Sequence, residues 1–187
     1  MTSWSRAKST QLVCLTLLVG SGACAPAPAP EVGEATIVYL VRHAERAEDG
    51  TNDPSLSEAG QTRATELVHV LRDAGVQRVF STDYRRTRLT ADPLATELGV
   101  SVEAFDPRDL SAFAEQLKAM TGARVVVVGH SNTTPELVGL LGGDSVRQMP
   151  EWEYDRLYVV GIEPTGAVRS LLLRYGASSA EPVEATH

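Results

Sequence analysis

Two short apolar runs mark this chain as an α/β protein. Residues 37–41 (IVYLV) and 124–129 (RVVVVG) consist largely of β-branched and other apolar residues, without polar alternation. Such continuous runs are typical of strands that are buried on both faces, as in parallel sheets covered by helices. A shorter run at 78–80 predicts a third strand of the same kind.

Helical signals lie between these strands. Apolar residues recur at helical spacing between 67 and 74, and Ser57 is a suitable N-cap for a helix that begins there. The segment 81–98 predicts a short helix, a break at Pro93 and a second helical piece, because proline lacks the backbone donor. The other predicted elements are a strand at 100–105, helices at 110–120 and 136–141, and strands at 155–162 and 167–175.

This order of elements predicts one α/β domain with a mostly parallel central sheet and helices on both faces, a three-layer sandwich. Residues 35–176 form the predicted domain, and roughly 140 residues is a size that one hydrophobic core supports. Residues 177–187 are predicted to be a disordered tail. No internal repeat is present.

The first 23 residues have the pattern of a signal peptide. Arg6 and Lys8 provide a positive start, and residues 12–19 form an apolar stretch too short to span a bilayer as a mature helix. The sequence SGAC, which ends at Cys24, resembles a bacterial lipoprotein signal in which that cysteine is lipidated and becomes the mature N-terminus. A serine stands where this signal usually has leucine.

Ordinary signal-peptidase cleavage around Cys24 is the alternative, and it would leave Pro26 directly after the cut. Residues 24–34 are predicted to be a proline-rich linker, because they contain the extended sequence APAPAP. Both cysteines, Cys14 and Cys24, lie in or beside the leader, so the predicted domain contains no disulfide.

The charge balance limits the partners. The chain has 17 basic and 24 acidic residues, and removal of the leader would leave 15 and 24, a formal charge of −9. Such a domain is not a general nucleic-acid binder, and anionic lipid would repel it. We therefore expect an exported lipoprotein that faces the periplasm or the cell exterior and contacts the membrane only through its acyl chains.

Candidate chemistry lies directly after the strands. Arg42 and His43 follow the first apolar run, and His130 follows the run at 124–129. The third strand leads into the basic segment 83–91, DYRRTRLTA. Because parallel strands end at one edge of a sheet, where open α/β sheets bind ligands, we expect these side chains to converge.

Three motifs in this order resemble those of the histidine phosphatase superfamily, the phosphoglycerate-mutase-like fold. They are Arg42-His43-Ala44-Glu45 for R-H-G/A-E, Arg86-Thr87 with Thr90-Ala91 for R-T-x-x-T-A, and Gly129-His130 for the second histidine. One tripeptide would be weak support, but three in order at strand ends are specific. The resemblance covers about residues 35–175 and implies a small phosphatase that needs no metal or other cofactor.

The residue chemistry agrees with this resemblance. Arg42 and Arg86 offer forked donors to phosphate oxygens. His43 is the candidate nucleophile that forms a phosphohistidine, and nearby arginines should keep its imidazole neutral. His130 is expected to donate a hydrogen bond to the phosphoryl oxygens and to stabilise their charge. Ser131, where the next helix approaches, is expected to bind the small phosphorylated substrate with them.

Four acidic residues are candidates for the proton donor to the leaving group. The resemblance implies a Glu or Asp from the segment after the arginine helix or directly after the second histidine, and Ser131 excludes the latter. Asp106 is the first candidate because it ends a predicted strand, although it would equally serve as a turn or N-cap residue. Asp109, Glu103 and Glu136 are the alternatives.

Three readings of function stay open at this stage. The first is an exported phosphatase of phosphomonoesters. The second is a non-catalytic lipoprotein that uses an anion pocket for binding, and the third is a phosphatase of protein phosphohistidine, whose leaving group needs less protonation. Mutase activity is disfavoured, because the mutases of this family carry longer insertions that enclose a sugar phosphate. The residues do not select the physiological substrate or the oligomeric state.

Overall fold

The computed structural model describes residues 33–144, 147–179 and 181. The predicted leader and Cys24 lie outside these residues, as does most of the linker. Ten elements follow in the order β1 (Thr36–Arg42), α1 (Glu58–Leu71), β2 (Arg78–Ser81), α2 (Arg85–Leu98), β3 (Val102–Ala104), α3 (Leu110–Lys118), β4 (Arg124–Gly129), α4 (Thr133–Leu140), β5 (Arg156–Ile162) and β6 (Val168–Arg174). No helix among the described residues is both long and apolar enough to cross a membrane.

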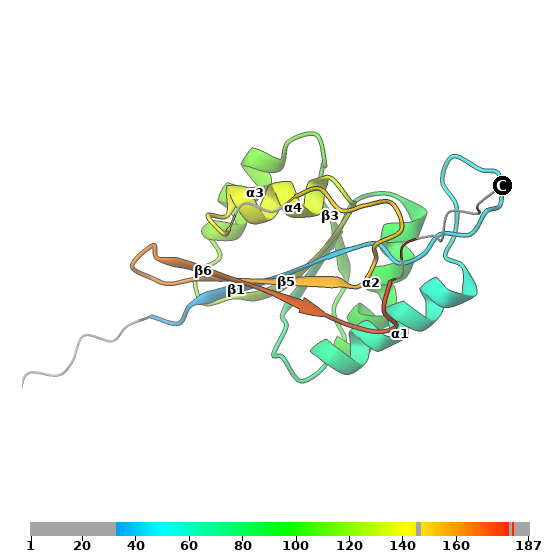
Figure 1. Cartoon of the computed structure of the whole chain (residues 1–187). Coiled ribbons are helices and arrows are strands. Elements are labelled where there is room, and N and C mark those ends of the chain that lie inside the picture. The colour runs from blue at the N-terminus through cyan, green and yellow to red at the C-terminus, as the bar shows by residue number, and fades with distance from the viewer. Residues whose placement is uncertain (1–32, 145–146, 180, 182–187) are drawn as a thin grey trace, which may run out of the picture. The chain divides into compact units, whose positions relative to one another are not determined.

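The strands form one six-stranded sheet in the order β3-β2-β4-β1-β5-β6. Figure 1 shows β1, β5 and β6 of this sheet side by side. The first four strands of this order are parallel, while β5 runs antiparallel to β1, and β6 runs antiparallel to β5. The predicted fold class, a mostly parallel sheet with helices on both faces, is confirmed. The apolar runs of β1 and β4 lie side by side in the middle of the sheet, which explains why neither alternates with polar residues.

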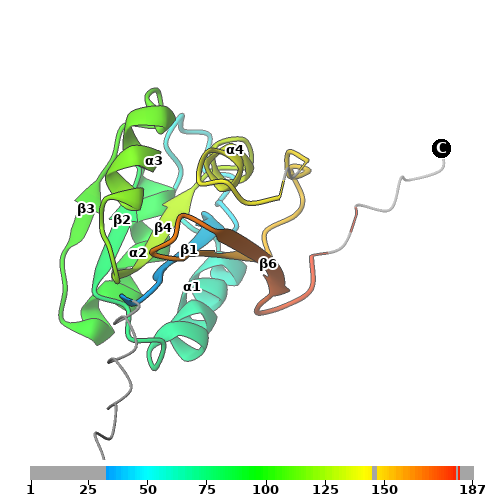
Figure 2. The same cartoon turned by 90° about the vertical axis from the view of Figure 1, so that its left-hand side faces the viewer.

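The two faces of the sheet carry separate hydrophobic clusters. Figure 2 shows α1 and α4 on opposite sides of the sheet. Val38 and Leu40 of β1 pack with residues of α3 and α4, whereas Val41 packs with residues of α1 and α2. This division follows from the two-residue period of a strand, which sends neighbouring side chains to opposite faces. The paired helices on each face hold the strand ends rigidly, and the candidate site lies at those ends.

The predicted break at Pro93 does not occur, because α2 is continuous from Arg85 to Leu98. Proline inside a helix costs about 3 kcal/mol through the lost hydrogen bond and the ring clash. Leu94 and Ala95, directly after it, are buried against the sheet, and burial of one leucine contributes roughly 1.5–3 kcal/mol. Tertiary packing therefore offsets the local penalty.

The helix starts agree with the predicted caps. Ser57 accepts a hydrogen bond from the Gly60 amide at the start of α1, and Asp109 caps α3 in the same way. Helix α4 begins three residues earlier than the sequence pattern predicted, at Thr133. This earlier start places the first turn of α4 directly beside the end of β4.

The described start of the predicted tail is bonded to the domain. Arg63 of α1 donates to the Ala177 carbonyl at 2.8 Å, and the Tyr154 amide donates to Ser179 Oγ at 2.9 Å. The packed region therefore continues to at least Ser179, beyond the predicted boundary at residue 176.

Candidate active site

The register of the central strands brings the two histidines together. Arg42 at the end of β1 pairs with Gly129 at the end of β4, so His43 and His130 are each the next residue of neighbouring strands. The His43 amide donates to the Gly129 carbonyl at 2.9 Å, and the two imidazole rings lie 5.4 Å apart at 67°. The predicted convergence at this sheet edge is thus present.

Helix α2 brings the second arginine to the same place. Arg86 lies in its first turn, and its Nη2 is 3.5 Å from Nδ1 of His130. The side chains meet around a pocket of about 410 Å³. Its lining consists of Arg42, His43, Arg46, Tyr84, Arg86, Pro107, His130, Ser131, Asn132, Thr133 and Glu151. All five residues on which the phosphate-site prediction rests therefore line one pocket.

His43 is held in one tautomer. Its Nδ1 lies 2.8 Å from the Ala44 carbonyl, which can only accept, so Nδ1 carries the hydrogen and Nε2 keeps its lone pair. Burial is the main cause that lowers the pKa of His43 to about 3, and Arg42, His130 and Arg86 lower it further. The imidazole is therefore neutral at neutral pH, as predicted, although burial contributes more than the arginines.

His130 is also neutral, and its hydrogen has two available positions. Burial, followed by the charges of Arg86 and Arg42, lowers the pKa of His130 to about 4. Its Nε2 lies 2.9 Å from Oγ1 of buried Thr82, a hydroxyl that can donate or accept. Nδ1 of His130 can therefore accept a hydrogen bond in the tautomer that is protonated on Nε2. In the tautomer that is protonated on Nδ1, it can donate one to an anion.

Arg42 is fixed mainly by neutral groups. Only 2% of its side chain is exposed, and its Nη1 donates to the carbonyls of Pro150, Glu151 and Glu153 at 2.9–3.0 Å. The guanidinium lies over the Tyr154 ring, 4.2 Å from the ring centre. Within the described residues, its carboxylate partner is the Glu151 side chain at 3.1 Å. Carbonyls orient a guanidinium without cancelling its charge, so much of that charge is available to an anionic ligand.

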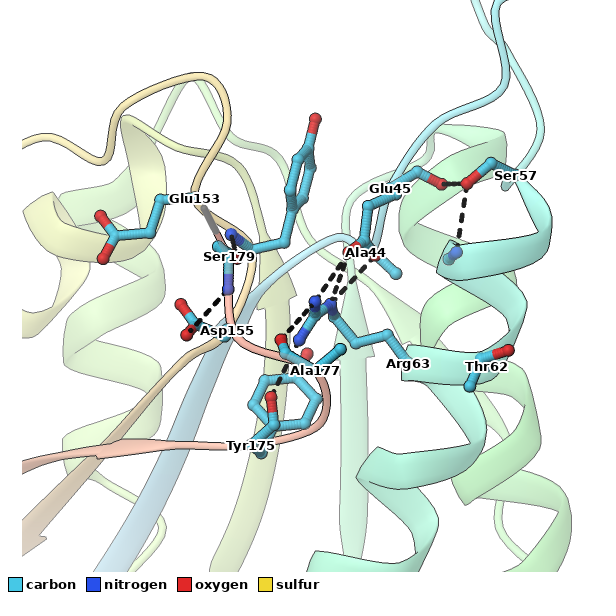
Figure 3. A network of polar contacts seen from close by, with 12 residues as sticks. Ala44, Glu45, Ser57, Thr62, Arg63, Glu153, Asp155, Tyr175, Ala177 and Ser179 are labelled. Carbon is cyan, nitrogen blue, oxygen red and sulfur yellow. Dashed lines mark hydrogen bonds and ion pairs between the residues drawn. The ribbon is translucent and has the colours of Figure 1, made fainter. Parts of the chain in front are cut away.

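The acidic residue of the R-H-A-E motif has a structural role (Figure 3). Arg63 of α1 holds both carboxylate oxygens of Glu45, with contacts between 2.7 and 3.0 Å, and also donates to the carbonyls of Tyr175 and Ala177. The Ser57 amide donates to the Glu45 carbonyl at 2.9 Å. Glu45 therefore ties the turn after His43 to α1 and to the chain after β6.

Asp106 does not join the pocket. Its carboxylate bonds the side chain and backbone of Arg108, and these contacts lower its pKa to about 2. A carboxyl so readily ionised is a poor proton donor near neutral pH. The alternatives lie elsewhere too, because Asp109 caps α3, Glu103 pairs with Arg78, and Glu136 lies on the exposed side of α4. Among the described residues, the one acid that lines the pocket is Glu151.

Several lining residues escaped the sequence analysis. Arg46 and Tyr84 lie beside the motifs that were recognised, so proximity along the chain was an available signal. Glu151 lies in a loop without periodicity or turn signature, and only the fold brings it to β1. Across the described ranges, no group of three or more His, Cys, Asp or Glu side chains is arranged to hold a metal ion.

Comparison with known proteins finds a family likeness over the first part of the domain. Residues 38–108 match the model of the histidine phosphatase superfamily (branch 1), and this segment contains both the R-H-A-E and R-T-x-x-T-A motifs. The match is to this segment, and the second histidine, His130, lies outside it.

Among curated relatives, a probable phosphoglycerate mutase GpmB of Erwinia tasmaniensis is 40% identical over 77 residues, which are 38% of this chain and 35% of that protein. The protein of the same name from Salmonella paratyphi A is 29% identical over 74% of this chain and 69% of its own length. The chain thus spans only about a third of the first relative it matches.

Solved structures share the fold at low identity. A protein histidine phosphatase SixA complexed with tungstate has a TM-score of 0.56 and 20% identity, over 74% of this chain and 95% of that one. A mycobacterial glucosyl-3-phosphoglycerate phosphatase has a TM-score of 0.59 and 17% identity, over 78% of this chain and all of the other. At these identities the likeness establishes the architecture and leaves the substrate open.

Proposed function

We propose that this protein is a metal-independent phosphatase that hydrolyses phosphomonoesters through a phosphohistidine on His43. The observation that carries this proposal is the state of His43, a neutral imidazole with Nδ1 bonded to a carbonyl and Nε2 left as a nucleophile. Arg42 and Arg86 line the same pocket and can hold the phosphoryl group in place.

The steps follow from the positions of these groups. Arg42 and Arg86 bind the phosphoryl oxygens, and Nε2 of His43 forms a bond to phosphorus while the bond to the leaving oxygen breaks. His130 donates a hydrogen bond to a phosphoryl oxygen in the tautomer that has its hydrogen on Nδ1. Water then attacks the phosphohistidine, which releases inorganic phosphate and restores neutral His43.

Two related activities would use the same site. A mutase would return the phosphoryl group to a second hydroxyl, as the names of the curated relatives suggest for those proteins. A protein phosphohistidine phosphatase would act on a side chain, as the name of SixA indicates for that protein. Hydrolysis of small esters is favoured here because the pocket contains a carboxyl, Glu151, which an alkoxide leaving group needs and a phosphohistidine does not.

The test uses the purified full-length chain and p-nitrophenyl phosphate in the presence of EDTA, beside His43→Asn. We expect hydrolysis that survives EDTA, a loss on the order of 10³-fold or more in the variant, and an acid-labile phosphoprotein in quenched wild type only. Activity that persists in His43→Asn would overturn the phosphohistidine mechanism. A folded wild type that is inactive on aryl phosphates, acetyl phosphate and phosphohistidine would favour the binding-protein alternative.

We also propose that the protein is exported and held at a membrane by lipid on Cys24, on the strength of the leader sequence alone. The test is the mass of the mature N-terminus from the membrane fraction, beside Cys24→Ala. A diacylated cysteine at residue 24 that the variant lacks would support the proposal. An intact leader, or a cut without lipid, would contradict it.

A further inference from the structure

We propose that Glu151 is the proton donor to the leaving group, a role that rests on the proposed phosphatase function. The proposal begins from an unusual contact: the carboxylate of Glu151 occupies the anion pocket of its own chain. Its Oε2 bonds Nη2 of Arg42 at 3.1 Å, and its Oε1 accepts from Ser131 Oγ at 3.2 Å. Both partners line the pocket that contains His43.

The backbone of Glu151 is fixed relative to this pocket. The Met149 amide donates to the Ser131 carbonyl at 3.1 Å, which joins the loop to the end of β4. Arg42 donates to the carbonyls of Pro150 and Glu151, and buried Glu153 anchors the same loop two residues further on. The loop is therefore tied to the proposed phosphate clamp itself, while the Glu151 side chain is 73% exposed.

Other acids near the pocket are committed to different partners. Asp53 receives hydrogen bonds from the Arg85 amide and contacts Arg86 at 3.5 Å, as a cap for α2. Glu45 is held by Arg63 on both oxygens, and Asp106 is held by Arg108. Within the described part of the chain, Glu151 is the carboxyl that shares the pocket with the nucleophile.

Substrate binding would change the state of this carboxyl. In the free protein Nη2 of Arg42 donates to the Glu151 carboxylate. A phosphomonoester dianion competes for the same guanidinium, and the displaced carboxylate then lies beside two like charges. The proposed role requires the acid form of Glu151 in this complex, and like charge on the substrate favours that form. In-line displacement places the leaving oxygen opposite His43, and the proposal requires the exposed side chain of Glu151 to reach that oxygen.

The proposed step balances. The lone pair on Nε2 of His43 forms the bond to phosphorus, the bond from phosphorus to the leaving oxygen breaks, and that oxygen takes the proton from the Glu151 carboxyl. The products are the alcohol, the phosphohistidine and the Glu151 carboxylate. In the second step the carboxylate accepts a proton from the attacking water, whose oxygen bonds phosphorus. Inorganic phosphate, neutral His43 and protonated Glu151 result.

If Glu151 is the proton donor, the loss of kcat/KM caused by its removal should depend on the leaving group. The experiment measures kcat/KM of the full-length wild type and Glu151→Gln on p-nitrophenyl phosphate, phenyl phosphate and glycerol 2-phosphate. Because nitrophenolate leaves without protonation, we expect the variant to stay within about 3-fold of wild type on that ester and to lose on the order of 10²-fold on the alkyl ester. Glu151→Asp should recover part of the loss.

Other patterns would overturn the proposal. An equal loss on all three esters would mean a structural role, and an equal gain would mean that Glu151 only blocks the anion site. Unchanged kinetics would remove it from the reaction, as would a leaving-group-dependent loss in Asp106→Asn instead. If His43→Asn abolishes the activity but Glu151→Gln shows none of the expected dependence, only this proposal fails. If the folded wild type turns over no ester, the proposed function and this role fail together.

Discussion

Two buried arginines in this protein are held by opposite means. Arg42 in the pocket is oriented by three backbone carbonyls and by one carboxylate that is largely exposed. Arg63, behind the R-H-A-E turn, is matched by both oxygens of Glu45 and by two further carbonyls. The two arginines therefore differ in what balances their charge. The charge of Arg63 is neutralised by Glu45 and stabilises the fold, whereas the charge of Arg42 is oriented mainly by neutral carbonyls and can act on an anionic ligand.

A second neutralised cluster lies behind the pocket loop. Buried Glu153 pairs with Arg156 and Arg174, and Asp155 pairs with Arg174. Burial alone would raise the pKa of Glu153, but the two arginines hold it below its ordinary value. The Glu153 carbonyl meanwhile accepts from Arg42. Glu153 therefore contacts both groups: its carboxylate pairs with Arg156 and Arg174, and its carbonyl orients Arg42 in the pocket.

The largest effect is expected when a pocket cation that contributes little to stability is removed. Arg86→Ala should lower kcat/KM for an aryl phosphate by about 10²–10³-fold, because the phosphoryl charge loses one oriented clamp. Its melting temperature should change little, since its ion pair with Asp53 is long, at 3.5 Å. Arg88→Ala, two residues along and paired with exposed Asp83, is the matched control. Comparable losses in both variants would refute the assignment.

The reverse test removes a framework cation. Arg63→Met should lower the free energy of unfolding by about 3–5 kcal/mol, because it leaves the Glu45 carboxylate without its partner. Urea unfolding measures the change, and kcat/KM of the folded protein should fall less than in the pocket variant. Adding Glu45→Gln should restore part of the stability. A loss below about 1 kcal/mol would place this pair among ordinary surface ion pairs.

The smallest expected effect is on the pH dependence. The pKa values of His43 and His130 are lowered from 6.5 to about 3 and about 4 in the folded protein. The unfolded chain therefore binds protons near pH 6.5 that the folded chain does not, so this part of the stability is present above 6.5 and is lost as pH falls toward 4 and then 3. Melting temperatures between pH 7 and 4 should decline less steeply in His43→Asn, and equal slopes would contradict the neutral histidine.

Most of the framework and half of the site could be predicted from the sequence, for a physical reason. Residues 37–41 and 124–129 carry their own strand signal, and His43 and His130 follow them without an intervening turn. A residue that directly follows a buried strand inherits its position from that strand. The predicted break at Pro93 failed because the burial of Leu94 and Ala95, a property of the folded sheet, offsets the local signal.

The other side of the pocket could not be predicted in this way. Glu151 and Tyr154 lie in an irregular loop that reaches Arg42 across more than a hundred residues of sequence. Their placement depends on hydrogen bonds from Arg42 to three backbone carbonyls. Because every residue has a backbone carbonyl, such bonds cannot be predicted from the amino-acid pattern. Asp106 was favoured because it ends a strand, but its neighbour Arg108 occupies its carboxylate.

The paired register of β1 and β4 has a consequence for how such a protein can diversify. Because Arg42 lies opposite Gly129, the spacing of the two histidines is set by the sheet, and a single-residue deletion in either strand would turn one imidazole to the opposite face. Arg46 and Glu151 border the same pocket from outside the two strands. Chain length can therefore change outside the strands without altering the spacing of His43 and His130.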